Sequence, residues 1–433
     1  MNKKNDYLEK FKKIYEKNES NFYFITGHAG SGKTTLLIKL KTYFRERGIN
    51  AFFTSSTGIS ATIFEGTTLN YYLGNLNYDH KDHFPIITGR NNRRWKIKEK
   101  QIKNTDVLII DEISMVKSDY FELIDLLLQK AKGNNQKFGG IKIIMFGDFL
   151  QLPPVIKNYQ GENLDEKWIF KSKIWNQINI KYIKLTKNFR QIDQKYIENL
   201  QKIRNGNYDQ ETENYFKFIE KKELNNQKEI TKLVSTNQSA DNINNNNLNK
   251  IKEKEHIYNS YFEVDEKYLE RKKQIIEEYQ KEITIIPKKL ILKKGAKVMS
   301  LINKKEDKII NGSIGIVKNL NHSFVEVEWL EGNKTKIKEY TWNKVDQKGE
   351  TICSFTQIPL KLAYAITIHK SQGMTLSELL IDCENIFAEG QLYTALSRIK
   401  NPKNMYILNF DKKYVKANKE AIKFYENTNW TEF

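Results

Sequence analysis

The sequence contains very little cysteine and no long apolar run. Only Cys353 and Cys383 occur in 433 residues, which excludes a disulfide framework and any four-thiolate zinc or iron–sulfur centre. No stretch approaches the ~18 consecutive apolar residues that a membrane-spanning helix requires. The first 21 residues mix lysine with four acidic side chains and lack the apolar segment of a secretory signal. We therefore expect a soluble intracellular protein, cytoplasmic in a prokaryote, that does not act on membranes.

Acidic side chains are far fewer than basic ones. The 72 Lys and Arg residues against 53 Asp and Glu residues give a formal net charge of +19. Such an excess is typical of proteins that bind a polyanion, most often nucleic acid. The chain is also crowded with Lys, Asn and Ile and poor in Arg, Pro and Ala, as AT-rich coding produces. The charge alone therefore leaves both explanations open.

Short apolar runs alternate with helical spacing in the first part of the chain. With the segment 34–47 as a helix, this pattern predicts a parallel sheet covered on both faces. Two polar stretches interrupt it: 73–104 is interpreted as a small insertion, and 191–279 as mostly helical, with an asparagine cluster at 242–249 in a turn or helix end. The predicted strands are residues 22–26, 51–55, 107–110 and 141–146.

The character of the chain changes after residue 290. Short β-like runs are separated by Gly, Asn and Asp turns, which predicts a small β-barrel inserted before the sheet resumes near residue 361. The predicted barrel strands are residues 297–303, 313–317, 324–330 and 335–339.

A glycine-rich segment between the first predicted strand and helix matches G-x-x-x-x-G-K-[ST]. Glycines let the backbone wrap a phosphate, and the loop N–H groups and helix N-terminus point at the anion. Lys33 is expected to reach the β- and γ-phosphates, and the Thr34 hydroxyl to bind Mg²⁺. The predicted nucleotide-binding residues are Gly27, His28, Ala29, Gly30, Ser31, Gly32, Lys33, Thr34 and Thr35.

Two carboxylates, Asp111 and Glu112, end the apolar strand that begins at Val107. At the carboxyl edge of a parallel sheet they would lie beside the glycine-rich loop. Asp111 would then hold Mg²⁺ and Glu112 would polarise the attacking water. Alone, the pair is also consistent with a solvated strand end. Beside a phosphate loop, it favours ATP hydrolysis over nucleotide binding alone.

Three later segments carry side chains suited to a motor. Gln151, within 147–155, follows a predicted buried strand and is suited to sensing the γ-phosphate. Arg190 and Arg398 lie far apart in the chain, and we expect both to close on one γ-phosphate and stabilise transition-state charge. A lone arginine more commonly forms a surface salt bridge, but the surrounding sequence favours the catalytic interpretation.

Taken in order, these segments resemble a superfamily 1 DNA helicase of the 5′→3′ branch (1B). Within it they resemble the Pif-type (petite integration frequency) family, which is related to RecD-type helicases. The stretch 119–141, ending Phe138-Gly139-Gly140-Ile141, resembles the signature that separates the two types. The resemblance covers residues 22–408. The matching segments are the phosphate loop, the Asp-Glu strand, residues 147–155, residues 185–191, Thr367-Ile368-His369-Lys370-Ser371-Gln372-Gly373 and Ala395-Leu396-Ser397-Arg398.

The resemblance implies an α/β fold of two RecA-like P-loop domains with parallel sheets. A small wedge insertion in the first domain would split the duplex, and an SH3-like β-barrel insertion in the second would cover the DNA channel. The implied domains are 1A at 1–72 and 105–190 with the ATP site, 1B at 73–104, 2A at 191–289 and 355–433, and 2B at 290–354.

The resemblance also implies the residues that contact DNA and nucleotide. A single strand would cross the tops of both sheets and be held through phosphates and base stacking. Gly373 is expected at the nucleotide, and His369 is either a DNA contact or a core histidine. Two basic groups are interpreted either as DNA-binding patches or as solvated faces. They are Lys293, Lys294 and Lys297, and Arg90, Arg93 and Arg94 with Trp95. The candidate DNA contacts are Thr57, Gly58, Thr67, Thr68, Thr236, Asn237 and His369, with Phe84 and Pro85 as the wedge.

The implied activity is ATP- and Mg²⁺-dependent 5′→3′ movement on single-stranded DNA, with unwinding of duplex or structured DNA. Expected partners are single-stranded DNA and 5′-tailed duplex, then G-quadruplexes and DNA–RNA hybrids, with a monomer as the active unit. Expected roles are DNA replication, repair and telomere maintenance. The alternatives are a RecD-like subunit of a nuclease complex, an RNA-directed motor, a P-loop phosphotransferase and a passive DNA-binding protein. A phosphotransferase would explain the phosphate loop but not two widely separated arginine motifs.

The sequence departs from the family at two places. Family members usually carry a glutamine upstream of the phosphate loop that reads adenine, whereas the first glutamine here is Gln101. The resemblance therefore does not extend to adenine selectivity. Asn70 stands where a DNA-contacting motif often has histidine.

Overall fold

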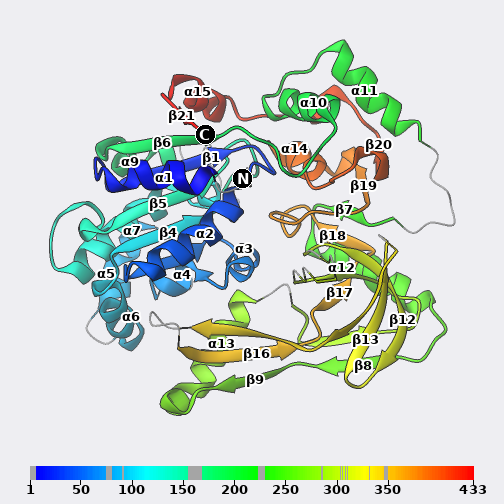
Figure 1. Ribbon diagram of the computed structural model, residues 1–433, viewed down its shortest axis with the longest axis horizontal. Helices are drawn as coiled ribbons and strands as arrows, with labels where there is room; N and C mark the ends of the chain where they lie inside the picture. Colours follow the sequence, from blue (N-terminus) through cyan, green and yellow to red (C-terminus); the bar gives the residue numbers. More distant parts are fainter. Residues whose placement is uncertain are drawn as a thin grey trace. The chain divides into compact units, whose positions relative to one another are not determined.

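A computed structural model gives the structure of the chain (Figure 1). The structure divides into two compact units, and each is described by itself. Unit 1 comprises Met1–Phe189, Lys344–Glu350 and Lys419–Phe433, and unit 2 comprises Arg190–Asn343 and Thr351–Asn418. The described residues are 6–74, 80–89, 92–154, 168–222, 230–283, 286–302, 304, 306, 307, 309, 311–330, 332–345 and 350–433.

A seven-stranded sheet forms the centre of unit 1, and each of its pairings is parallel. Its order is β21-β6-β1-β5-β4-β2-β3, so the strand that precedes the phosphate loop lies in the middle. The four strands predicted from the sequence are confirmed. The bounds are β1 (Phe22–Gly27), β2 (Ala51–Ser55), β3 (Thr67–Thr68), β4 (Val107–Asp111), β5 (Lys142–Gly147), β6 (Ile180–Leu185) and β21 (Thr431–Glu432).

Helices cover both faces of this sheet, which explains why its central strands are apolar throughout. On one face, Leu36 and Leu40 of α2 pack with Ile25 of β1. On the other, Leu127 of α7 packs in a cluster with Leu108 of β4. The helices of unit 1 are α1 (Asp6–Glu16), α2 (Lys33–Glu46), α3 (Gly58–Ile63), α4 (Leu69–Tyr72), α5 (Phe84–Thr88), α6 (Arg93–Lys103), α7 (Ser118–Lys132), α9 (Lys173–Gln177) and α15 (Lys419–Asn427).

The end of the chain differs from the expectation that 355–433 belongs with the second domain. Residues Lys419–Phe433 belong to unit 1, where β21 pairs in parallel with β6. The cause is aromatic packing, because Phe424 stacks on Phe170 at 4.8 Å and Trp430 lies 5.6 Å from Tyr182. These partners are about 250 residues away in sequence, so no local pattern indicated the pairing.

The signature-like stretch has a structural explanation. Phe138 is buried with a φ of 54°, and its N–H donates to Asp125 Oδ1 of α7 at 2.5 Å. Gly139 has a φ of +63°, and a Cβ there would lie 2.6 Å from the Leu128 carbonyl oxygen. The segment therefore fixes the end of α7 against the start of β5 in a conformation that strongly favours glycine at position 139.

Unit 2 contains a four-stranded parallel sheet of order β18-β7-β19-β20. The expectation of a second parallel sheet is confirmed. Its strands are β7 (Lys232–Val234), β18 (Ala365–Thr367), β19 (Leu379–Asp382) and β20 (Met405–Leu408). The helices of unit 2 are α10 (Gln194–Arg204), α11 (Gln210–Glu220), α12 (Asn237–Lys250), α13 (Lys272–Glu282) and α14 (Gln391–Leu396).

The asparagine cluster at 242–249 lies within α12 and reaches its last turn, so the placement in a turn was wrong and the placement at a helix end holds only for its last residues. Ala240 and Leu248 are buried on one face of the helix. The Asn244 amide accepts from the Ala365 N–H and donates to the Ala365 carbonyl, both at 2.9 Å. Tertiary contacts of this kind outweigh the low helix propensity of asparagine.

The other strands of unit 2 are antiparallel, and the last two residues of one of them, β15, belong to unit 1. A five-stranded sheet of order β14-β13-β12-β11-β17 contains the four strands predicted after residue 290. The stretch 191–279 was predicted mostly helical, but it also supplies β8 and β9, which pair with later strands. The bounds are β8 (His256–Asn259), β9 (Tyr261–Val264), β10 (Lys289–Leu292), β11 (Lys297–Ser300), β12 (Ile314–Asn321), β13 (Phe324–Trp329), β14 (Lys334–Lys338), β15 (Tyr340–Val345), β16 (Thr351–Gln357) and β17 (Leu360–Leu362).

Candidate nucleotide and DNA sites

The phosphate loop joins β1 to α2 and is shaped by its glycines. A Cβ on Gly27 would lie 2.6 Å from the Leu185 carbonyl oxygen, and Gly32 has a φ of +93° with the Phe189 ring 3.3 Å from such a Cβ. Lys33 Nζ donates to the carbonyls of Gly27 at 2.5 Å and of His28 at 3.2 Å, which holds the ammonium at the loop. The loop therefore has the backbone approach and the charge that a phosphate requires.

Ser31 supplies a further indication of a ligand. Its Oγ is buried and has no hydrogen-bond partner within the part of the chain that the structure describes. A buried hydroxyl normally finds a partner. Its position in the phosphate loop would allow this hydroxyl to hydrogen-bond to a phosphate. Ala29 is buried, whereas Thr34 and Thr35 are half-buried in the first turn of α2.

The loop after β6 packs on the phosphate loop because β6 and β1 are neighbours in the sheet. The Phe189 N–H donates to the Gly30 carbonyl at 2.8 Å. His28 Nε2 lies 3.1 Å from the Thr186 carbonyl oxygen. The arginine motif 185–191 thus begins in direct contact with the nucleotide loop.

Asp111 and Glu112 end β4 two strands away from β1. Burial raises the pKa of Asp111, the neighbouring Glu112 charge raises it further, and the Lys33 ammonium opposes the shift. Glu112 has a φ of 52°, a conformation that costs roughly 1–3 kcal/mol and is found often at functional sites. Its carbonyl accepts from Ser56 Oγ at 2.7 Å. The carboxylates are therefore held in place by their surroundings.

Thr34 and Asp111 offer the oxygen donors that Mg²⁺ prefers. Mg²⁺ is usually held by one or two carboxylates together with substrate phosphates and water. In the described residues, no group of three His, Cys, Asp or Glu side chains could hold a metal ion by itself. The donor set fits an ion that depends on nucleotide phosphates for its remaining ligands.

Gln151 lies in the loop after β5, which pairs with β1. It is buried, and its Nε2 donates to Asp148 Oδ2 at 3.4 Å. Asp148 is also buried and accepts at Oδ1 from the Leu150 N–H and from the Tyr425 hydroxyl. The sequence did not indicate Tyr425, because it lies in α15, far from any motif. Val155 lies outside the described residues.

Arg190 and Arg398 both belong to unit 2, where they meet at Ser397. Arg190 Nη1 donates to the Ser397 carbonyl at 2.9 Å, and Arg398 Nη2 donates to Ser397 Oγ at 2.7 Å. Arg398 is only 1% exposed, and its Nε donates to the Thr394 carbonyl. Gln191 Nε2 also donates to the Ser397 carbonyl, at 3.1 Å. Two arginines separated by more than 200 residues therefore form one cluster.

The candidate DNA residues of unit 1 lie at two neighbouring strands: Thr57 and Gly58 follow the carboxyl end of β2, and Thr67 and Thr68 form β3. Thr57 Oγ1 accepts from the Ser60 N–H, and Thr68 Oγ1 accepts from the Tyr71 N–H. These hydroxyls cap helices, and Thr67 is buried. Gly58 begins α3. The loops lie where the sequence predicts, but the threonine side chains also have structural partners.

One candidate DNA residue of unit 2, Asn237, lines a pocket of about 410 Å³, together with Lys361, Thr367 and Lys370. Burial and the nearby Lys370 lower the pKa of Lys361 to about 7. Thr236 is exposed, and its hydroxyl accepts from the Ser239 N–H at the start of α12.

The segment after β18 contains His369 and Gly373. His369 is half-buried, and burial lowers its pKa, which favours the neutral ring at neutral pH. Gly373 is exposed with a φ of +79°. Neither residue has a fully buried, core-like position.

Several predicted surface groups have other surroundings. Phe84 packs partly buried against the core, while Pro85 and Ile86 are exposed, with Ile86 at 57%. Trp95 is 2% exposed in the core, so it cannot stack on bases without leaving that core. Asn70 Oδ1 accepts from the Tyr120 hydroxyl. Among its described residues, the insertion thus exposes Pro85 and Ile86, while Phe84 and Trp95 pack against the core.

The expected basic patch before the barrel is mostly internal, and Arg90 of the other patch lies outside the described residues. Lys297 forms a buried ion pair with Glu378. Lys293 is buried and donates to the Ile251 carbonyl at 3.0 Å, whereas Lys294 is exposed. Lys293 and Lys297 are therefore structural residues, because long side chains can bury their stems and satisfy their charge within the protein.

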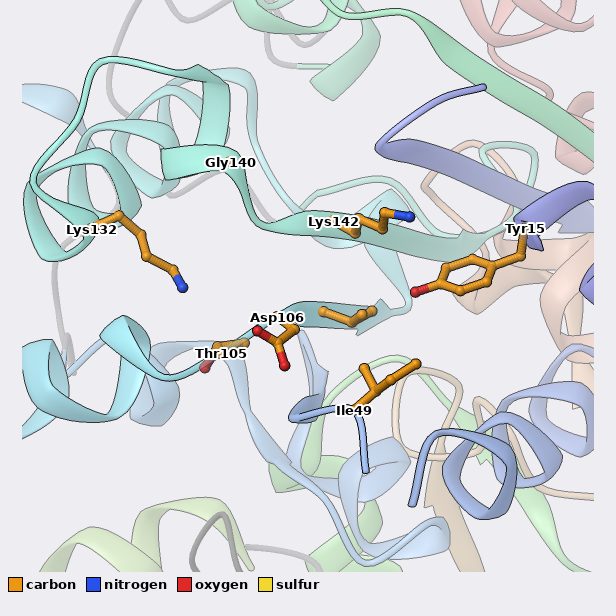
Figure 2. Close-up of a pocket in the computed structure, with 8 residues that line it drawn as sticks. Tyr15, Ile49, Thr105, Asp106, Lys132, Gly140 and Lys142 are labelled. Atoms are coloured by element: carbon orange, nitrogen blue, oxygen red, sulfur yellow. The ribbon is translucent and has the colours of Figure 1, made fainter. Parts of the chain in front are cut away.

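A second pocket of about 350 Å³ lies at the opposite edge of the unit 1 sheet, where β4 and β5 begin (Figure 2). Figure 2 shows the Tyr15 hydroxyl and the Lys132 ammonium pointing into it from opposite sides. Lys132 Nζ donates to the Lys103 carbonyl, and Lys142 Nζ donates to Asn18 Oδ1. Because the ammonium groups have protein partners and the nucleotide loops lie at the other edge, this pocket is not the nucleotide site.

Comparison with known proteins agrees with the site. The sequence model that describes the PIF1-like helicase family matches residues 3–214 of this chain. The chain is 31% identical to the ATP-dependent DNA helicase Pif1 of Campylobacter jejuni, with 94% of this chain and 95% of that protein covered. The structure of Bacteroides sp Pif1 in complex with ADP-AlF4 matches with a TM-score of 0.81 at 29% identity, covering 97% of this chain and 95% of that one. Bacteroides Pif1 bound to ssDNA matches with a TM-score of 0.64 at 29% identity, covering 98% and 96%.

One further structural observation concerns membranes. Within the described ranges, no helix has the length and apolar character needed to cross a bilayer.

Proposed function

Because this chain belongs to the PIF1-like helicase family and is an ATP-dependent DNA helicase, we propose that it moves 5′→3′ along single-stranded DNA and unwinds the duplex ahead. The observation that carries the proposal is one edge of the unit 1 sheet. There the phosphate loop, Asp111 with Glu112, and the Gln151 loop follow β1, β4 and β5, which are adjacent in the sheet. The direction of movement rests on the family resemblance.

Each group at that edge has a proposed task in ATP hydrolysis. Lys33 binds the β- and γ-phosphates, Glu112 orients and polarises the attacking water, and Gln151 senses the γ-phosphate. Mg²⁺, held by Thr34, Asp111 and phosphate oxygens, would neutralise phosphate charge. The raised pKa of Asp111 supports this assignment, because a nearby cation would stabilise the buried carboxylate.

Arg190 and Arg398 are proposed to stabilise charge on the γ-phosphate in the transition state. Both guanidinium groups donate hydrogen bonds to Ser397, which supports a joint action, because a displacement of one would move the residue that holds the other. Gly373 is proposed to approach the same nucleotide.

The proposed DNA track uses phosphate contacts, because a motor must tolerate any sequence. In unit 1 it comprises Thr57, Gly58, Thr67 and Thr68. In unit 2 it comprises Thr236, Asn237 and His369. Asn237 lines a pocket that Lys361 and Lys370 also line. The exposed Pro85, next to Phe84, is the proposed wedge.

The proposed substrates are single-stranded DNA and 5′-tailed duplex, then G-quadruplexes and DNA–RNA hybrids, with a monomer as the active unit. The solved relative bound to ssDNA supports the first of these. The roles in DNA replication, repair and telomere maintenance are proposed on the family relationship alone.

Unwinding of duplexes that carry either a 5′ or a 3′ tail tests this function. With ATP and Mg²⁺ present, we expect strand separation on the 5′-tailed duplex and none on the 3′-tailed one. Unwinding from the 3′ tail alone would contradict the proposed direction. ATP turnover that does not respond to single-stranded DNA would contradict the motor itself.

A further inference from the structure

Tyr425 has an unusual position for a residue outside every motif. It lies near the end of α15 in unit 1, where its ring stacks on Trp430 at 5.4 Å between centroids. The indole N–H of Trp430 donates to the Tyr425 carbonyl at 2.9 Å. The Phe149 ring lies 6.4 Å away on the loop that follows β5. This aromatic packing directs the Tyr425 hydroxyl toward the carboxyl edge of the sheet.

The Tyr425 hydroxyl joins two loops of the nucleotide site. It lies 3.1 Å from Asp148 Oδ1, and because a carboxylate only accepts, the hydroxyl is the donor. It accepts from the Phe149 N–H at 3.2 Å. Its oxygen also lies 2.7 Å from Thr26 Oγ1, immediately before Gly27 of the phosphate loop. One hydroxyl therefore contacts both the strand that enters the phosphate loop and the loop that carries Gln151.

Asp148 passes this contact on to Gln151. The carboxylate is 1% exposed, and its other oxygen accepts from Gln151 Nε2 at 3.4 Å. The Leu150 N–H donates to the same oxygen that Tyr425 holds, at 3.2 Å. These hydrogen bonds help to orient the buried Asp148 carboxylate. Among them, the bond from Tyr425 comes from outside the loop.

The residues after α15 hold the other side of the phosphate loop. The carbonyl of Phe433 accepts from Thr186 at both its N–H (3.2 Å) and its Oγ1 (2.7 Å). Phe433 also donates its N–H to the Lys184 carbonyl at 2.9 Å. This is the loop whose Phe189 N–H donates to Gly30. The last fifteen residues therefore contact the loops on both sides of the nucleotide site.

We propose that Tyr425 is a positioning residue for ATP hydrolysis, which acts through Asp148 to orient the Gln151 amide beside the phosphate loop. The proposal rests on the proposed task of Gln151 at the γ-phosphate. Tyr425 does not itself touch the nucleotide. Its loss should therefore slow the chemical step while leaving ATP binding nearly intact.

Tyr425→Phe tests the proposal, because it removes the hydroxyl and keeps the ring. With saturating single-stranded DNA, we expect kcat for ATP to fall roughly tenfold, which equals ~1.4 kcal/mol. The KM for ATP should change by less than roughly twofold, because Lys33 and the loop N–H groups are untouched. Binding of a single-stranded oligonucleotide without nucleotide should not change.

Tyr23→Phe is the matched control. Tyr23 also lies in unit 1, where it is fully buried whereas Tyr425 is half-buried, and its hydroxyl donates to the Ser20 carbonyl at 2.8 Å, at the amino end of β1. It loses the same chemical group far from the nucleotide edge. If both variants show the same kcat loss, the effect is general destabilisation and the proposal is wrong. An unchanged kcat in Tyr425→Phe also overturns it.

A double-mutant cycle separates this proposal from the proposed function. If Tyr425 acts through Gln151, then adding Tyr425→Phe to the Gln151→Ala variant should lower kcat by less than about twofold more. Fully additive losses would show that Tyr425 acts by another route. If the proposed function itself were wrong, the result would be different: ATP turnover by the unaltered protein would not respond to DNA.

Discussion

In each of the two parallel sheets, one strand is followed in the chain by a helix, but the two helix starts are built differently. In unit 1, β1 leads to α2, whose first position is preceded by Gly32 with no side-chain cap. In unit 2, β7 leads to α12, where Thr236 caps the helix by accepting from the Ser239 N–H. A start without a side-chain cap leaves its N–H groups available for phosphate, whereas a capped start satisfies one of them internally.

The difference explains how one architecture can serve two tasks. Unit 1 places glycines, Lys33 and two carboxylates at the carboxyl edge of its sheet, which suits nucleotide chemistry. Unit 2 places hydroxyl, amide and lysine groups near its corresponding edge, together with the Arg190 and Arg398 cluster. These groups suit a nucleic-acid backbone and transition-state charge. The chemistry of each unit therefore depends on its loops and not on its sheet.

Removal of the phosphate-binding charge in unit 1 should have the largest effect. Lys33→Ala is expected to reduce DNA-stimulated ATP turnover by roughly a thousandfold or more, because the ammonium stabilises charge that grows in the transition state. Affinity for a single-stranded oligonucleotide without nucleotide should stay within roughly twofold. A phosphate-release assay and fluorescence anisotropy would measure the two quantities.

Lys41→Ala is the control for that change. Lys41 lies on the same helix, but its Nζ donates to the Phe64 carbonyl at 2.9 Å and not to the phosphate loop. Turnover should remain near that of the unaltered protein. Equal losses in both variants would show that any α2 lysine matters, and the assigned role of Lys33 would be lost.

The arginine cluster of unit 2 should have the next largest effect. Arg190→Ala is expected to lower kcat by roughly a hundredfold, because it removes a positive charge that stabilises the transition state. Thermal stability should change little, because the Ser397 carbonyl keeps its bond from Gln191. Gln191→Leu provides the opposite pattern, with loss of buried hydrogen bonds and a lower Tm but retained turnover per folded molecule. Measurements of kcat and of Tm would separate the two variants. Equal changes of kcat and Tm in both would contradict the different roles of Arg190 and Gln191.

Much of the nucleotide edge could be predicted from sequence because its determinants are local. A strand, a glycine loop and a helix are adjacent in the chain, and Asp111 with Glu112 directly ends its strand. Those patterns specify both the local conformation and its chemistry. The strands of the first sheet were predicted for the same reason, since fully buried strands are continuously apolar.

The parts that sequence did not reveal depend on contacts between distant segments. Tyr425 reaches the nucleotide edge because α15 packs within unit 1, and the buried Lys297 forms an ion pair with Glu378. In α12, the Asn244 amide pairs with a strand edge more than 100 residues away. Composition identifies such residues as an aromatic, a cation and a polar side chain, and it contains no information about these partners.

A smaller effect is expected from Lys361 in the unit 2 pocket. With a pKa lowered to about 7, its ammonium is charged at pH 6 and largely neutral at pH 8. Lys370 opposes the charge, and Asp241 favours it. DNA phosphate would stabilise the charged form, so strand affinity should fall roughly three- to tenfold between pH 6 and pH 8.

Lys361→Met is the control, because it keeps the chain length and cannot titrate. Its strand affinity should be weaker at pH 6 and nearly independent of pH over the same range. The effect on folding has the opposite sign to that on binding. The unfolded chain holds its proton up to a pKa near 10.5, so the folded state of the unaltered protein gains stability as the pH rises above 7. An affinity profile that is the same in both proteins would remove Lys361 from the track.

The smallest expected effect is at the cap that distinguishes the two helix starts. Thr236→Val keeps the shape of the side chain but cannot accept from the Ser239 N–H, so folding should lose about 1 kcal/mol. For a unit of this size, that corresponds to a Tm lower by about 2–4 °C. Thr236→Ser restores the acceptor and should restore the Tm. Turnover at saturating DNA should be unchanged in both variants, because Thr236 is a proposed DNA contact and has no proposed task at the nucleotide. If Thr236→Val instead lowered kcat as Lys33→Ala does, the start of α12 would take part in nucleotide chemistry, and the contrast between a phosphate-binding helix start and a capped one would no longer hold.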